Sequence, residues 1–149
     1  MTHRQEISGI SGWELIAPLM GEMPPDLEAV VQKCESPIEQ LFACALGLVI
    51  LTIPVAVRPT LDAQVPIGKY RADLVIVSFN GAPRIVVECD GAEFHKDAAR
   101  DAKRTEEIEA RGYRVMRVTG SEIHHNPLAL AKSLLWLAGF LVTVPRLHS

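Results

Sequence analysis

Two carboxylates stand at the ends of apolar runs, where a charge is costly. Asp73 precedes the run Leu-Val-Ile-Val at 74–77, and Glu88 follows the run Ile-Val-Val at 85–87. Uninterrupted apolar runs of this kind are typical of strands that are buried on both faces. A carboxylate in such a place is unfavourable unless it is paired, hydrogen-bonded or bound to a metal. Both acids therefore need a partner.

A turn signal between the two runs predicts that these acids face each other. Asn80-Gly81 is typical of a two-residue β-hairpin loop. A loop centred there pairs Asp73 with Glu88, and a four-residue loop gives the same pairing, whereas a three-residue loop or a bulge does not. Directly opposed residues have Cβ atoms about 5 Å apart. The two carboxylates would then share one place at the end of a strand pair.

Two opposed carboxylates suit a hard divalent cation. Mg²⁺ takes one or two carboxylates and keeps several waters and substrate phosphate oxygens, and it stabilises the charge that develops during phosphoryl transfer. The alternative is an ion-pair cluster without chemistry. In that arrangement Asp90, on the same face as Glu88, pairs with Arg71 opposite it. The spacing alone leaves both interpretations open.

The elements around these residues predict a mixed α/β domain. Ser36 is a suitable N-cap, Pro37 suits the first helical position, and Glu39 completes a capping box, so a helix starts here and runs to about residue 48. A sheet covered by helices on both faces is expected. Its further elements are strands at 55–58, 61–66, 70–79, 83–90 and 113–118, and helices near residue 13, at 96–111 and at 127–141.

Four segments in this order resemble the PD-(D/E)XK nuclease superfamily. They are SPIEQLF, YRADLVIV, VVECDGAEFH and RDAKRTEEIEARGYRVMRV, which together span about residues 35–123. More closely, they resemble the small proteins similar to very-short-patch-repair endonucleases. The resemblance implies a restriction-endonuclease-like αβββαβ core, here followed by an apolar C-terminal helix. It also implies cleavage of DNA that depends on Mg²⁺, with Mn²⁺ as a substitute.

The same resemblance implies roles for individual residues. Asp73 and Glu88 match the superfamily's metal-binding acids, and the backbone carbonyl of Cys89 would be a third ligand. Glu39 matches the acidic residue of the first helix, which points toward the metal or its waters. The capping box at Ser36 explains Glu39 equally well without chemistry.

Position 90 departs from the superfamily's pattern. Asp90 stands where a lysine usually positions the attacking water. The segment 88–91 with His95 fits the E-x-D-G variant with a following histidine, so His95 would act as general base or contact the leaving group. Lys103 and Arg104 are alternative cations, although each also suits a solvated helix face.

A basic helix face is the expected contact for DNA. Lys96, Arg100 and Lys103 are spaced i, i+4 and i+7 and so share one face, with Arg104 beside it. Side chains of this type bind backbone phosphates.

Composition is consistent with an enzyme that acts on DNA. The chain has 149 residues, 48% of them hydrophobic and 22% charged, which excludes an intrinsically disordered chain. The net charge of −3 argues against a polybasic binder, yet the first 40 residues alone carry −5 and the rest carry +2. We divide the chain into an N-terminal helical extension, residues 1–30, and a nuclease domain, residues 31–149.

The cysteines and apolar stretches predict a cytoplasmic protein. Three cysteines without a CxxC spacing indicate neither a disulfide framework nor a zinc site. The first residues lack a signal peptide's apolar segment. The apolar stretches at 41–57 and 128–144 are interrupted before they reach the roughly 18 residues of a membrane span.

Three functions are compatible with these features. The first is a Mg²⁺-dependent DNA endonuclease, including one that nicks, in repair, restriction or mobile-element biology. The second is a catalytically weakened nuclease fold that binds nucleic acid or a protein, which the missing lysine favours. The third is a structural protein that forms a homodimer through its apolar C-terminal helix. We adopt the endonuclease as the working hypothesis.

Overall fold

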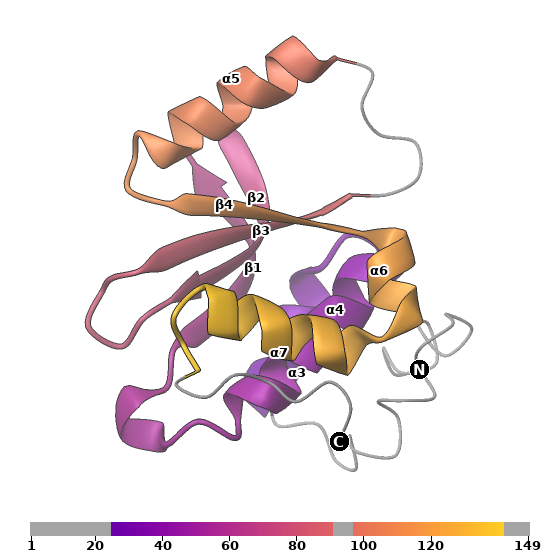
Figure 1. The fold of residues 1–149 in the computed structure, drawn as a ribbon, viewed down its shortest axis with the longest axis vertical. Helices are drawn as coiled ribbons and strands as arrows, with labels where there is room; N and C mark the ends of the chain where they lie inside the picture. Colours follow the sequence, from indigo (N-terminus) through magenta and orange to yellow (C-terminus); the bar gives the residue numbers. More distant parts are fainter. Residues whose placement is uncertain (1–24, 91–96, 142–149) are drawn as a thin grey trace.

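The computed structural model describes residues 25–90 and 97–141. In these ranges, helices surround one four-stranded sheet (Figure 1). In chain order the elements are α3 (Pro25–Lys33), α4 (Pro37–Ile50), the 3-10 turn η1 (Val55–Val57), β1 (Thr60–Ile67), β2 (Tyr70–Val77), β3 (Arg84–Asp90), α5 (Ala98–Glu109), β4 (Arg114–Thr119), α6 (Gly120–His125) and α7 (Pro127–Leu137).

The sheet has the strand order β1-β2-β3-β4. β1, β2 and β3 pair in antiparallel fashion, and β4 lies parallel to β3. A parallel neighbour needs a crossover connection, and α5 provides it. Figure 1 shows α5 on one side of the sheet and α3, α4 and α7 on the other. The predicted αβββαβ core with helices on both faces is thus confirmed.

The register of the central hairpin is the one predicted from Asn80-Gly81. Leu74 pairs with Val87, and Val77 pairs with Arg84. The loop has four residues rather than two, because the Ser78 N–H donates to the Pro83 carbonyl at 3.0 Å. Either loop length gives the same pairing, so the alignment of Asp73 with Glu88 is kept.

The predicted start of α4 is also observed. The Ser36 hydroxyl accepts a hydrogen bond from the Glu39 N–H at 3.2 Å, and Pro37 occupies the first helical position. The Glu39 carboxylate reaches back to the Ser36 hydroxyl and to the Glu35 N–H, at 3.1 and 3.4 Å. Almost all of α4 is buried, so this helix forms the centre of the main core.

Two hydrophobic cores lie on opposite faces of the sheet. On the side of α4, the core contains Leu74 and Ile76 of β2, and on the side of α5 it contains Val75 of β2 and Ile108 of α5. Strand residues alternate between faces, so every second apolar side chain enters the same core. This arrangement explains why the runs at 74–77 and 85–87 are continuously apolar.

The alternation is interrupted at Gln64 of β1. Ala63 packs on the α4 side but Val65 packs on the α5 side, although residues two apart in a strand normally share a face. Gln64 has a φ of 52°, in the left-handed region that few residues other than glycine adopt. On β2 the same change of face lies between Leu74 and Ala72. The alternation of β1 and β2 side chains between the two faces of the sheet therefore shifts by one residue at Gln64 and its neighbour Asp73.

Several element predictions need correction. The strand expected at 55–58 is η1, in which every residue is exposed and which belongs to no strand ladder. Apolar composition alone suggested a strand there, but without a neighbouring strand it cannot form one. The helix at 96–111 begins at Ala98 with Asp97 as its N-cap, and the helix at 127–141 ends at Leu137. The helix predicted near residue 13 lies outside the described residues.

Two helices, α3 and α6, were not predicted. α3 packs against α4 and β1, and Leu27 and Val30 contribute to the main core. The boundary proposed at residue 30 falls inside α3, and the division into an extension and a nuclease domain stays a prediction.

The apolar character of α7 is explained by packing inside the chain. Ala131, Leu134 and Leu135 are buried, and α7 lies along α4. Trp136 and Leu137 remain exposed at its end. None of the helices in the described ranges combines the length and apolar composition that crossing a bilayer requires.

The two-core arrangement predicts unequal effects of truncating two apolar residues of one hairpin. Ile76 is fully buried, whereas Phe79 in the loop is 59% exposed. Ile76→Ala should lower the free energy of unfolding in urea by about 2–4 kcal/mol, and Phe79→Ala should change it by less than about 0.5 kcal/mol. Equal losses for the two variants would contradict the assignment of Ile76 to the core.

Candidate active site

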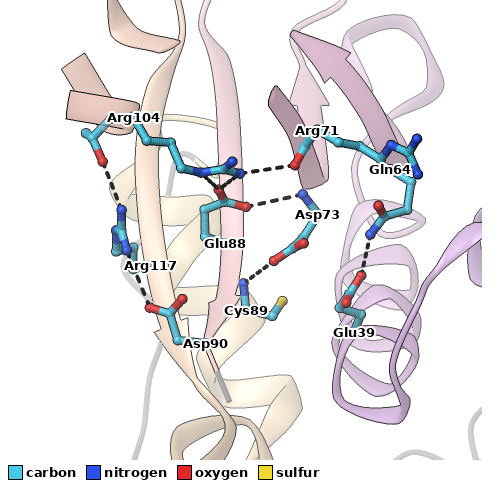
Figure 2. Close-up of polar contacts among 10 residues, drawn as sticks. Glu39, Gln64, Arg71, Asp73, Glu88, Cys89, Asp90, Arg104 and Arg117 are labelled. Carbon is cyan, nitrogen blue, oxygen red and sulfur yellow. Dashed lines mark hydrogen bonds and ion pairs between the residues drawn. The ribbon is translucent and has the colours of Figure 1, made fainter. Parts of the chain in front are cut away.

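Asp73 and Glu88 meet where β2 and β3 separate. The ladder between these strands ends at the pair Leu74–Val87. Beyond it, each carboxylate binds the backbone of the other strand: the Asp73 N–H donates to Glu88 Oε2 at 3.2 Å, and the Cys89 N–H donates to Asp73 Oδ2 at 2.9 Å (Figure 2). The two acids thus face one gap, as the register predicts.

Glu88 is buried, and its second oxygen is paired with Arg104. The Glu88 side chain is 7% exposed. Arg104 reaches it from α5 through Nε at 3.0 Å and through Nη2, which also donates to the Arg71 carbonyl at 3.1 Å. Arg104 is therefore turned inward rather than solvated on the helix face. It supplies the partner that a buried carboxylate requires.

The gap is electrostatically unfavourable for Asp73. Burial, together with the nearby charge of Glu88, raises the pKa of Asp73 to about 7. Glu39 also contributes to this rise. A cation in the gap would oppose each of these effects, because it stabilises the ionised form of the carboxylates.

Glu39 is held at the edge of the same site by Gln64. The Gln64 amide donates to Glu39 Oε1 at 2.7 Å, and Glu39 is 6% exposed. Burial raises the pKa of Glu39 above its ordinary value. The backbone of Gln64 itself is in the left-handed region. Gln64 was not among the predicted site residues. Its signal was faint, since a polar residue within a strand normally points to solvent.

Asp90 has a different partner from the one expected. It pairs with Arg117 of β4 at 3.9 Å, and Arg117 also donates to Thr105 of α5 at 2.9 Å. Arg71 pairs instead with Glu35 at 3.7 Å. The expected Arg71–Asp90 pair is wrong because the β2–β3 ladder does not continue beyond the pair Leu74–Val87, and Asp90 pairs in the sheet with β4.

The comparison with known families decides the classification. The model of the family REase_MTES_1575, a restriction-endonuclease-like family, matches residues 57–136, which is more than half of the chain. The chain belongs to this restriction-endonuclease-like family. The matched range includes Asp73, Glu88, Asp90 and Arg104, whereas Glu39 precedes it.

One relative is similar to this chain over part of its length. The chain is 33% identical over 72 residues to the uncharacterized protein YcjD of Escherichia coli (strain K12), and this alignment covers 48% of this chain. The chain spans 58% of the length of that relative. No solved structure matches the chain significantly.

Membership of this family makes a divalent metal the group to test against the site. Within residues 25–90 and 97–141, no three or more His, Cys, Asp or Glu side chains are arranged to hold a metal ion. Mg²⁺ needs only one or two carboxylates and completes its shell with water and substrate oxygens, so Asp73 and Glu88 fit it. Burial raises the pKa of the Cys89 thiol, so its side chain is a neutral group. The ligand predicted from Cys89 is its backbone carbonyl.

The remaining predicted site residues lie either on α5 or outside the described residues. Arg100 and Lys103 are exposed on α5, and Arg100 lies 3.8 Å from Asp97. His95 and Lys96 lie outside the described residues, so their predicted roles stay predictions.

Replacing Asp73 by asparagine should stabilise the metal-free protein, increasingly so at higher pH. The pKa of Asp73 rises from an ordinary 3.8 to about 7 on folding, so folding takes up a proton between these values. This carboxyl favours folding most below about pH 4 and opposes it as the pH rises through 7. Asparagine removes the charge but keeps an acceptor for the Cys89 N–H. The expected gain is about 1–2 kcal/mol at pH 8, limited by solvent screening, and close to none at pH 4.

Thermal unfolding in EDTA from pH 4 to pH 8 measures this effect. Asp62→Asn is the matched control, because the Asp62 side chain is 50% exposed and paired with Lys33. A stability difference between Asp73→Asn and the wild type that does not vary with pH would contradict a buried, charged Asp73.

Proposed function

We propose that this protein is an endonuclease that hydrolyses phosphodiester bonds of DNA with the aid of Mg²⁺, for which Mn²⁺ can substitute. The observation that carries the proposal is the gap between β2 and β3, where Asp73 and Glu88 converge in a restriction-endonuclease-like fold. Family membership supports nuclease activity and DNA as the substrate. Had the two side chains pointed to opposite faces of the sheet, a shared metal would be excluded.

In this proposal the acids hold and orient the reacting groups. Asp73 and Glu88 hold the metal, with the Cys89 carbonyl as a further ligand. When bound, the metal activates water and stabilises the negative charge that develops on the phosphate. Glu39, fixed by Gln64 at 2.7 Å, orients a water molecule at the edge of the gap.

Arg104 is the cation that best replaces the missing lysine. It already contacts Glu88, and its long side chain reaches from α5 into the site. A metal that neutralises Glu88 leaves the Arg104 guanidinium available for a phosphate oxygen. Asp90 is paired with Arg117, and we assign it a supporting role. His95 remains the proposed general base or leaving-group contact.

A binding module without catalysis is the second candidate. Both oxygens of Glu88 are engaged, one by Arg104 and one by the Asp73 N–H. A nuclease fold that had lost its metal would keep this closed arrangement. The two candidates differ in whether Mg²⁺ can compete with Arg104 for Glu88.

We also propose that the protein belongs to the very-short-patch-repair-like group, lies in the cytoplasm, nicks DNA, and acts in repair, restriction or mobile-element biology. A homodimer would use the exposed end of α7, where Trp136 and Leu137 reach solvent.

Cleavage should depend on both the metal and Glu88. We expect the wild type to nick supercoiled DNA with Mg²⁺ or Mn²⁺ and not with EDTA. Glu88→Ala should lower the rate of nicking at least about 100-fold, because metal-dependent charge stabilisation is lost. Agarose gels of supercoiled and linear DNA measure the rate. Glu109→Ala, which changes an exposed acid of α5, is the control. Retention of DNA without cleavage, unchanged in Glu88→Ala, would support the binding module instead.

Removing Arg104 should make stability depend on Mg²⁺. Arg104→Gln leaves buried Glu88 without its cation, which should cost about 3–5 kcal/mol in EDTA. Mg²⁺ at millimolar concentration should restore part of this loss, because a ligand bound only to the folded state stabilises it. Thermal unfolding with and without Mg²⁺ measures both effects. Arg100→Gln, at an 85% exposed side chain, should show neither. If Mg²⁺ stabilises Arg104→Gln no more than the wild type, Glu88 is not a metal ligand.

A further inference from the structure

The β1–β2 hairpin borders a hollow that opens onto Asp73. This hollow has a volume of about 490 Å³, and its lining includes two cations, Lys69 and Arg71, two acids, Glu35 and Asp73, and Gln64. Asp73, one of the two candidate metal-binding acids, therefore lies at the wall of a hollow that is open to solvent. A substrate strand that reaches Asp73 through this hollow must pass the cations of the hairpin.

Those cations are only loosely paired. The Lys69 side chain is 68% exposed and lies 3.8 Å from Glu107. The Arg71 side chain is 62% exposed and lies 3.7 Å from Glu35, which is itself 63% exposed. Solvent-exposed ion pairs of this kind contribute about 0–1 kcal/mol each, so a phosphate can displace the acid at little cost.

The hairpin is nevertheless fixed relative to the site. Its turn needs Gly68, whose φ is +60°, a backbone conformation that residues with a side chain rarely adopt. Arg104 donates to the Arg71 carbonyl, and its guanidinium lies 5.0 Å from the centre of the Tyr70 ring (Arg104 and Arg71 in Figure 2). The residue that binds Glu88 thus also holds the cation-bearing strand in place.

The surface along the other side of α5 is much less suited to phosphate. A second hollow, of about 470 Å³, lies there between α5 and β4, and its lining includes Asp101, Glu106, Glu109 and Arg117. Three acids and one arginine give this surface a negative balance, which repels a phosphate backbone.

We propose that the DNA backbone runs through the hollow beside the β1–β2 hairpin, where Lys69 and Arg71 contact phosphates that adjoin the one to be cut. This inference rests on the proposed function and adds the path of the substrate. It differs from the path first expected, over the α5 face of Lys96, Arg100 and Lys103. In the proposed path, Arg104 lies between the hairpin and the catalytic gap.

Binding without cleavage tests the path independently of catalysis. Fluorescence anisotropy with a labelled duplex in EDTA, at several salt concentrations, gives the Kd and the salt dependence. Lys69→Glu and Arg71→Glu should each raise the Kd by about 3- to 10-fold and lower the salt slope by about one, since each removes a phosphate contact. Lys132→Glu is the matched control, because Lys132 is exposed on α7 across the sheet. Lys103→Glu tests the α5 face.

The outcomes separate this inference from the proposed function. If Lys69→Glu and Arg71→Glu bind like Lys132→Glu while Lys103→Glu binds more weakly, the path over the hairpin is wrong although the protein still binds DNA. If the wild type neither binds nor cuts DNA, both the path and the proposed function are wrong. Thermal unfolding of each variant confirms that it is folded, which is expected because both side chains are mostly solvent-exposed.

Discussion

The site depends on the separation of β2 and β3 immediately after the pair Leu74–Val87. In a continued ladder, backbone groups would bond each other and the side chains would stand apart from them. Here the carboxylates of Asp73 and Glu88 take the place of backbone partners, each on the opposite strand. This substitution satisfies two backbone N–H groups and at the same time brings two like charges together. Arg104 offsets the charge of Glu88, whereas burial and the charge of Glu88 raise the pKa of Asp73 to about 7.

The elements that surround this gap each fix one side of it. α4 contributes Glu39 from its first turn, α5 contributes Arg104, and the turn in β1 at Gln64 lets an amide reach Glu39. Glu88 and Glu39 are buried, which strengthens the charge interactions that they make. A metal-free site of this kind is a compromise between charge repulsion and backbone hydrogen bonding. The folded structure can accommodate the repulsion between the acids because the same carboxylates also accept backbone hydrogen bonds.

The central part of the fold could be predicted from local signals. The apolar runs identified β2 and β3, Asn80-Gly81 set their register, and the capping residues at Ser36 marked the start of α4. These features depend on neighbours in sequence or on one turn. The placement of Asp73 opposite Glu88 followed directly from that register, because a loop centred at Asn80-Gly81 aligns the two residues.

The partners of the acids could not be predicted in the same way. Arg104, Gln64 and Arg117 reach the site from elements whose rotation and separation depend on tertiary packing. Arg104 lies in a helix rich in acids, so its sequence surroundings suggested a solvated face. The Arg71–Asp90 pair was wrong for a related reason: register arithmetic was extended past the point where the strands part. Sequence patterns give the spacing along an element, but not where a ladder ends.

The four-residue loop at 79–82 has a consequence for how this chain can vary in length. The loop is exposed, so an insertion there can be absorbed without moving either strand. One residue inserted between Arg84 and Glu88 would instead carry Glu88 to the α4 side, away from Arg104. Length variation among related proteins should therefore collect in the loop and be absent from the short strand segment beside it. The number of residues from Arg84 to Glu88 must therefore stay constant, because it sets the position of the acid relative to the turn.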